Sequence, residues 1–231
     1  MKNRSLKWRR HVLALVVCLS VAAALTPAGR RHAAAAASHV TATASAAAVG
    51  ASLREGDLIF QTSRSSQSIA IQHATASAWS HMGMIVLREG KPYVLEAAQT
   101  VRTTPLANWI ARGERGHFTI KRLREADKLL TPAAPGLLER AAHPLLGRAY
   151  DTTFEWSDER MYCSELVWKI YHRALGIDIG QLQRIRDFNL ADPIVAAVMK
   201  QRYGAAVPLD ETVIAPVAMY DSLLLMTVVE R

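Results

Sequence analysis

Two apolar runs joined by a short turn place the strongest constraint on how this chain can fold. The runs occupy residues 81–87 and 93–98, and Glu89-Gly90 lies in the turn between them. Short apolar runs that are separated by a glycine-containing turn predict an antiparallel β-hairpin. The fold must therefore contain a sheet in which strands adjacent in the sequence pair with one another.

Helix and strand patterns are mixed along the rest of the chain. Further strands are expected at residues 56–60 and 117–123 and in two β-rich runs around 212–214 and 223–229. Helices are expected at residues 65–77, 104–112, 131–146, 163–175 and 192–204. The second of these helices should take Thr104 as its cap and Pro105 as its first helical residue. Because the strands group as hairpins, the pattern predicts an α+β fold and not a doubly wound one.

The N-terminal segment has the features of a secretory signal. Residues 1–11 are basic without an acidic residue, residues 12–25 are apolar, and small residues follow. We expect a signal peptide over residues 1–37, an Ala/Ser/Thr-rich flexible linker or processed leader over 38–53, and one domain over 54–231. An uncleaved N-terminal membrane anchor is the alternative, although the apolar run is shorter than the roughly 20 residues that span a bilayer.

These features predict an exported protein, either periplasmic or extracellular. Its mature N-terminus should fall between about Ala28 and Ala51, because the small residues of a cleavage region lie there. N-terminal sequencing of exported protein measures this position directly. A chain that still begins at Met1 would contradict cleavage.

The net charge of +8 comes from the leader and not from the domain. The first fifty residues hold seven Lys and Arg and no Asp or Glu, which leaves 21 basic and 20 acidic residues from Ala51 onward. A nearly neutral domain gives no electrostatic indication of nucleic-acid binding. No nucleotide loop or flavin motif is visible, so no cofactor is expected.

Outside the leader the chain has a single cysteine, Cys163, at the start of the helix expected at 163–175. Exported proteins usually pair their cysteines, so an unpaired thiol is an inert buried residue, an intermolecular link or a nucleophile. The positive end of the helix dipole favours a thiolate, and the backbone N–H of Cys163 can donate to an oxyanion. Glu165 in the first helical turn opposes this effect.

A nucleophilic cysteine needs a base, which is usually histidine. The candidates His73 and His143 lie in helix patterns, His172 lies more than two turns along the Cys163 helix, and His117 is a weak candidate. His81 opens the first strand of the hairpin and is the preferred base.

Glu96, on the return strand, is the candidate that orients His81. If the hairpin turn centres between Glu89 and Gly90, Glu96 lies opposite Gly83 and diagonal to His81, within reach of its ring. A one-residue change in the turn would put Glu96 on the other face. A buried structural glutamate is the alternative interpretation.

Four segments in this order resemble a known family. They are Gly56-Asp57-Leu58-Ile59-Phe60, Ser80-His81-Met82-Gly83, Val94-Leu95-Glu96-Ala97 and Tyr162-Cys163-Ser164-Glu165-Leu166-Val167. From about Arg54 to its end, the chain resembles the circularly permuted papain-like hydrolases of the YiiX type, relatives of the NlpC cell-wall peptidases. The resemblance implies an antiparallel sheet packed against a cysteine-bearing helix.

The resemblance also implies roles for individual residues. Cys163 would be the nucleophile, His81 the base and Glu96 the third catalytic residue. Tyr150, and by its position Tyr162, would lie near the thiol or the oxyanion. The NlpC relatives usually have Asp before the cysteine and Gly two residues after it, whereas this chain has Tyr162 and Glu165. This departure puts the NlpC substrate pocket, and with it cell-wall peptide specificity, in doubt.

The leading hypothesis is an exported cysteine hydrolase that cleaves an amide or ester by acyl transfer, on a peptide, an acyl lipid or another small molecule of the cell envelope. A groove lined by Trp79, Trp109 and Trp156 would favour acyl chains, although each tryptophan is also a candidate core residue. A non-catalytic acyl- or peptide-binding module is the alternative. A metal site formed by His81, Glu96 and Cys163 is a third hypothesis, although no short-spaced ligand pair is present.

Overall fold

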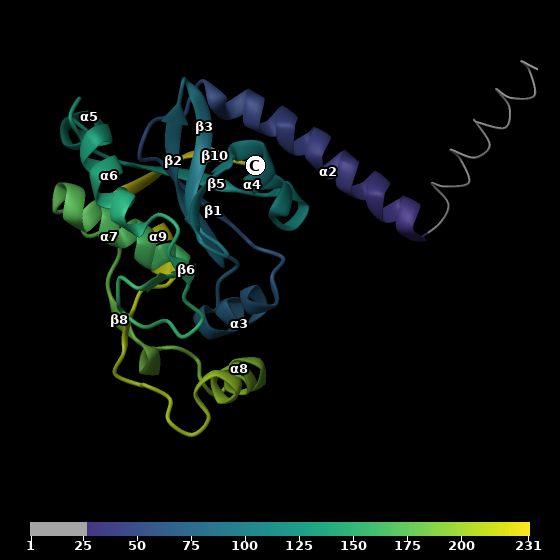
Figure 1. Ribbon diagram of the computed structural model, residues 1–231, viewed down its shortest axis with the longest axis vertical. Coiled ribbons are helices and arrows are strands. Elements are labelled where there is room, and N and C mark those ends of the chain that lie inside the picture. Colours follow the sequence, from purple (N-terminus) through teal and green to yellow (C-terminus); the bar gives the residue numbers. More distant parts are fainter. Residues whose placement is uncertain (1–26) are drawn as a thin grey trace, which may run out of the picture. The chain divides into compact units, whose positions relative to one another are not determined.

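The computed structural model describes residues 27–231, of which residues 42–231 form a compact unit (Figure 1). The apolar run of the leader and Cys18 lie outside the described residues. Helix α2 (Pro27–Gly50) occupies most of the segment that was expected to be a flexible linker. Alanine favours helix, and the last turns of α2 bury Ala42 and Val49 in the domain core. The boundaries between leader, linker and domain stay predictions.

A six-stranded antiparallel sheet forms the centre of the domain, in the order β10-β5-β1-β2-β3-β4. Its strands are β1 (Leu58–Gln61), β2 (His81–Arg88), β3 (Lys91–Ala97), β4 (Val101–Pro105), β5 (Thr119–Leu123) and β10 (Leu225–Glu230). The C-terminal strand therefore closes one edge beside β5. The sheet and its flanking helices confirm the predicted α+β class.

The hairpin of β2 and β3 has the predicted register. Met84 pairs with Leu95, which is the register in which facing residue numbers sum to 179. Glu89 and Gly90 make a two-residue turn with positive φ angles of 51° and 74°, the geometry that matches the twist of paired strands. Glu96 thus lies on the same face of the sheet as His81.

The sheet buries both of its faces. On one face Phe60, Met82 and Met84 pack against helix α7 (Cys163–Leu175), which also contacts α6. On the other face Ile59, Ile85 and their neighbours pack against α4 (Leu106–Arg112). Successive strand residues point to opposite faces, so strands of a sheet that is covered on both sides have nearly continuous apolar sequences.

The remaining elements surround these layers, and two pairs form small sheets. They are α3 (Ser66–Thr75), η1 (Glu114–Gly116), α5 (Ala126–Leu129), α6 (Ala134–Ala142), η2 (His143–Leu145), β6 (Ala149–Tyr150), β7 (Arg160–Met161), β8 (Gln183–Arg184), η3 (Ile185–Asp187), α8 (Pro193–Tyr203), β9 (Thr212–Val213) and α9 (Pro216–Tyr220). Helices α7 and α8 lie where the sequence predicts them, and each ends before a glycine with positive φ.

Two predictions about helices are wrong. Thr104 does not cap α4 but belongs to β4, an unpredicted strand, and Pro105 is the residue that precedes the helix. The single helix expected over 131–146 ends as an α-helix at Ala142 and continues as η2. Pro144 has no N–H to continue the α-helical ladder, which explains the break.

Within residues 27–231, no helix is both long and apolar enough to cross a membrane.

Gly83 is needed for the hairpin to pack closely. A Cβ atom at this position would overlap Val94 Cγ1 and lie 2.7 Å from the Leu95 carbonyl oxygen. We expect Gly83→Ala to lower the free energy of unfolding by about 1–3 kcal/mol, measured by urea denaturation. Gly50→Ala is the matched control, because a Cβ atom added there would meet no other atom within 4 Å. Equal stability of the two variants would contradict this account.

Candidate active site

Cys163 is the first residue of α7 and is buried, with 2% of its surface exposed. Strand β7 leads into it, and Tyr162 is the extended N-cap residue between them. The thiol therefore sits where the unpaired N–H groups of a helix start are found. Among the described residues it is the free cysteine, as the sequence predicts.

His81 opens β2 and forms a close pair with Glu96. Its Nε2 atom lies 2.7 Å from Glu96 Oε2, and its side chain is 13% exposed. The ring stacks on fully buried Trp109, with centroids 5.8 Å apart and planes 22° apart. The diagonal pairing predicted from the hairpin register is therefore present, and the indole fixes the ring that the carboxylate orients.

Glu96 is fully buried and is held by three close side-chain contacts, with Arg102 Nε farther away at 3.9 Å from Oε1. Thr104 Oγ1 and Arg112 Nη2 donate to Oε1 at 2.6 and 2.5 Å, while His81 contacts Oε2. Burial would raise the pKa of Glu96, but His81, Arg112 and Thr104 together lower it to about 2. The carboxylate stays ionised over the whole physiological pH range.

Thr104 and Arg112 were not predicted as site residues. Strand β4 positions both residues. Glu96 pairs with Arg102 in the β3–β4 ladder, so Thr104, two residues along β4, is the diagonal neighbour of Glu96 on the same face. Arg112 ends α4, the helix that β4 leads into. A sequence prediction of β4 would have brought Thr104 to Glu96.

His81 holds a proton more tightly than a free imidazole. Burial alone would lower its pKa, but hydrogen bonds to Cys163 and Glu96 and their negative charge raise it to about 9. The Cys163 contact is the strongest of these raising effects. At neutral pH the ring is therefore an imidazolium between the sulfur and the carboxylate. The other helical histidines take no part: His73 contacts Asp192, and His172 contacts Asp178.

The two tyrosines have different surroundings. Tyr150 ends β6, accepts a hydrogen bond from Gln67 Nε2 at 2.8 Å and lines the cavities on both sides of the site. Tyr162 is buried, and its hydroxyl oxygen accepts from the Ile214 N–H at 3.0 Å. Ser164 Oγ donates to the Ile214 carbonyl at 2.7 Å. Tyr162 thus anchors a neighbouring segment to the start of α7, whereas Tyr150 faces the space around the thiol.

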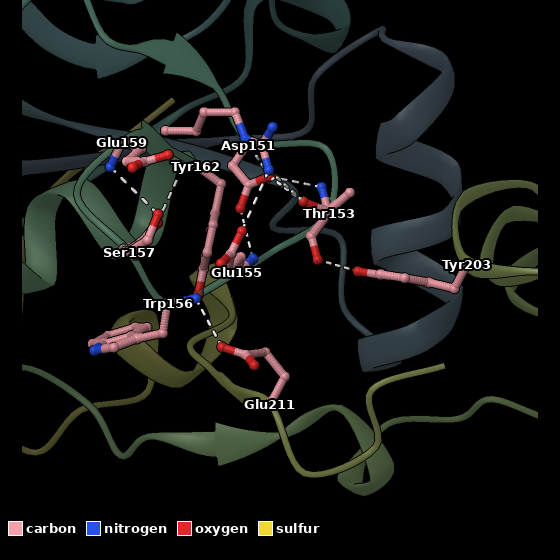
Figure 2. A network of polar contacts seen from close by, with 11 residues as sticks. Asp151, Thr153, Glu155, Trp156, Ser157, Glu159, Tyr162, Tyr203 and Glu211 are labelled. Atoms are coloured by element: carbon pink, nitrogen blue, oxygen red, sulfur yellow. Dashed lines mark hydrogen bonds and ion pairs between the residues drawn. The ribbon is translucent and has the colours of Figure 1, made fainter. Parts of the chain in front are cut away.

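A buried carboxylate holds the loop that precedes the cysteine. Asp151 accepts from the backbone N–H groups of Thr153 and Glu155 at 2.8 and 2.6 Å (Figure 2). Its own N–H donates to the Met161 carbonyl. The Tyr203 hydroxyl of α8 donates to the Thr153 carbonyl in the same network. The loop is therefore tied both to β7, which positions Cys163, and to α8.

Glu165, which was expected to oppose a thiolate, is paired. Its Oε1 lies 2.8 Å from Lys169 Nζ, one helical turn along, and both side chains are nearly inaccessible. Burial raises the pKa of Glu165 to about 7, although Lys169 and the Tyr162 N–H act in the opposite direction. Its charge near the thiol is therefore reduced by Lys169 and by partial protonation at neutral pH.

Two cavities with opposite character meet at this site. An apolar cavity on the Cys163 side has an empty volume of about 610 Å³, including its opening to solvent. Its walls come from α3, α8 and the segments around Phe154, Phe188 and Ile214. A polar cavity on the His81 side is lined by Gln61, Arg64, Arg112 and their neighbours. Tyr150 and Ile71 border both.

None of the three tryptophans considered for a substrate groove lines either cavity. Trp109 is buried beneath His81, Trp79 stacks on Tyr220 with centroids 4.5 Å apart, and Trp156 packs edge-on against Trp168. Trp109 is a core residue and the other two are half-buried against the core, so the core interpretation holds and other side chains form the apolar cavity.

Comparison with known proteins identifies the family. Residues 52–229 match the model of a family described as permuted papain-like amidase enzymes, YaeF/YiiX, C92 family. The chain belongs to this family. It is 48% identical over 176 residues to the uncharacterized protein YiiX of Escherichia coli K12, covering 76% of this chain and 86% of YiiX. The permuted papain-like fold and a hydrolase class follow from membership; the roles of individual residues stay predictions.

A solved structure has the same fold. It is described as the crystal structure of metalloprotein yiiX from Escherichia coli O157:H7, and it matches with a TM-score of 0.74 and 48% identity over 77% of this chain and 97% of its own. A metal needs available donor atoms, and in this chain both Glu96 oxygens already accept hydrogen bonds or ion-pair contacts. Residues 27–231 also contain no group of three or more His, Cys, Asp or Glu side chains suited to a metal. The donor set described here therefore does not fit a metal site.

The ionisation of His81 is expected to depend on Glu96. In Glu96→Gln the buried negative charge is lost, so the pKa of His81 should fall from about 9 towards its ordinary value of about 6.5. Titration of ¹³C-labelled histidine by NMR measures the shift. Glu230→Gln, an exposed change on β10, is the control and should leave His81 unaffected.

The folded Glu96→Gln variant should also lose most acyl transfer, because the neutral amide no longer stabilises the imidazolium. An unchanged His81 titration together with full activity would remove Glu96 from the site.

Proposed function

We propose that this protein is an exported thiol amidase that cleaves the bond between an apolar acyl group and an amine. The observation that carries the proposal is the His81–Glu96 pair, 2.7 Å apart, beside the buried thiol of Cys163 at a helix start. The family's description as amidases supports an amide as the bond. The leader supports export.

The site residues supply each step of acyl transfer. With the proton of the Cys163–His81 pair already on His81, the Cys163 sulfur attacks the substrate carbonyl carbon. The developing oxyanion accepts from the Cys163 backbone N–H and from the Tyr150 hydroxyl. His81 then gives its proton to the leaving amine as the carbon–nitrogen bond breaks, which leaves a thioester on Cys163.

Water completes the cycle. His81 takes a proton from a water molecule that attacks the thioester, and the carboxylic acid is released as the carbon–sulfur bond breaks, which restores the Cys163 sulfur beside a protonated His81. Glu96 keeps the ring oriented and stabilises the imidazolium in both halves of the reaction. Arg112 and Thr104 hold the carboxylate in place throughout.

The acyl group is assigned to the apolar cavity because Cys163 lines it. Nearly all of its wall is aliphatic or aromatic, and Phe154 enters it from the loop that Asp151 holds. Burial of apolar surface is worth about 0.8 kcal/mol per methylene. The affinity for a hydrocarbon chain therefore increases as the chain lengthens into this cavity. A short polar peptide gains no comparable binding free energy there.

The proposal predicts a dependence on acyl chain length. With N-acyl amides of increasing length, kcat/KM should rise about fourfold per added methylene until the cavity is filled, at about 0.8 kcal/mol each. Ala74→Phe, within the cavity wall on α3, should abolish the gain for long chains and spare short ones. Liquid chromatography with mass spectrometry of the released acid measures both.

The controls separate this result from a change in folding. Ala196→Phe places the same side chain on the exposed side of α8 and should behave as the wild type. Cys163→Ala and His81→Ala should release no acid. Binding of N-acyl amides without any release by the wild type would instead establish a non-catalytic acyl-binding module.

A further inference from the structure

The polar cavity beside His81 has a one-sided charge. Its charged lining side chains are Arg64, Arg112 and His81, and no carboxylate is among the described residues that line it. The uncharged polar groups that complete it are Gln61, Ser63, Ser65, Gln67, Ser80, Gln99 and Tyr150. Glu96 contacts two of these groups, His81 and Arg112, but does not line the cavity itself. Three groups that carry positive charge thus face one buried carboxylate.

Arg64 is fixed at the edge of this cavity by the end of α4. Its Nη2 and Nε atoms donate to the carbonyls of Ala111 and Arg112 at 2.6 and 3.3 Å. These carbonyls belong to the last turn of the helix, where backbone acceptors are otherwise unpaired. The guanidinium is therefore held beside the space it lines, while the residue remains exposed.

Gln61 contributes a buried polar side chain to the wall of this cavity. It is 1% exposed, lines the polar cavity, and its Oε1 atom has no hydrogen-bond partner within the part of the chain described. Arg112 Nε is likewise buried and unpaired. Buried polar groups are rarely left unsatisfied, because each costs about 1–3 kcal/mol. Both atoms are themselves inaccessible, and Gln61 Oε1 lies against Gly113. A ligand group in the cavity would instead contact the exposed parts of the lining side chains, above all the Arg64 and Arg112 guanidinium groups.

The direction of the reaction decides which half of a substrate this ligand group belongs to. The leaving amine must take its proton from His81, so it lies on the His81 side of the scissile bond. The polar cavity is lined by His81, and the apolar cavity by Cys163. The polar cavity is therefore the site for the amine portion.

We propose that the amine portion of the substrate carries a negatively charged group, a carboxylate or a phosphate, which Arg64 and Arg112 bind. This inference rests on the proposed function and names its substrate class: amides that join an apolar acyl chain to an anionic amine. An Arg pair recognises either anion through charge-assisted hydrogen bonds. A neutral or cationic amine portion would leave the positive charge of the cavity-lining side chains without a counter-charge.

Binding to the inactive Cys163→Ala protein tests the inference apart from catalysis. The ligands are N-dodecanoylglycine and its neutral amide N-dodecanoylglycinamide, with N-dodecanoyl-phosphoethanolamine and N-dodecanoylethanolamine as the phosphate pair. In at least one of the two pairs, we expect the anionic ligand to bind about tenfold or more tightly than its neutral partner, because charge-assisted hydrogen bonds contribute that much binding free energy. The pair with the larger ratio identifies carboxylate or phosphate as the natural group.

Arg64→Gln in the same background should reduce that ratio to near one. The ratio is the readout because any disturbance of α4 weakens anionic and neutral ligands alike. Arg88→Gln is the matched control, since Arg88 lies at the other end of β2 and contacts Tyr93. Equal binding of charged and neutral ligands, or a ratio unchanged in Arg64→Gln, would overturn the inference. Hydrolysis by the wild type is measured separately, so failure of the amidase proposal is distinguished from failure of this one.

Discussion

The buried carboxylate of Glu96 is the group on which the arrangement of this site depends. An isolated ionised carboxylate is costly to bury, and the cost is offset only when charges and hydrogen bonds surround it. Thr104, Arg112 and His81 together meet that requirement from β4, α4 and β2. The same contacts that make Glu96 tolerable in the core fix the imidazole and favour its charged form. The contacts that stabilise the buried carboxylate are therefore also the contacts that position the proposed catalytic histidine.

The start of α7 is the second fixed point, and it is built from a different part of the chain. Asp151 ties the preceding loop to β7, and the Ile214 backbone is held by Tyr162 and Ser164 on either side of Cys163. These contacts set the walls of the apolar cavity at the same time as they place the thiol. The polar cavity is built on the opposite side, around His81 and the end of α4. A substrate with one apolar and one polar half matches this division.

Sequence reasoning predicted the parts of the site that depend on local pattern. The Glu89-Gly90 turn sets the hairpin register, and that register alone brings Glu96 to His81. Thr104 and Arg112 were missed because β4 has no alternating apolar pattern and is a strand only through its pairing with β3. The cavity walls were missed for a similar reason, because they join segments far apart in the sequence. Of the tryptophans considered instead, Trp109 is buried in the core, and Trp79 and Trp156 are half-buried against it.

The central claim is that Cys163 carries the acyl group during turnover. Intact-protein mass spectrometry of samples quenched with acid within milliseconds of mixing with an N-acyl amide tests it most directly. The account predicts a transient mass increase equal to the acyl group, located at Cys163 by peptide mapping and absent in His81→Ala. Steady release of the acid with no adduct at Cys163, or an adduct that forms equally well in His81→Ala, would contradict it.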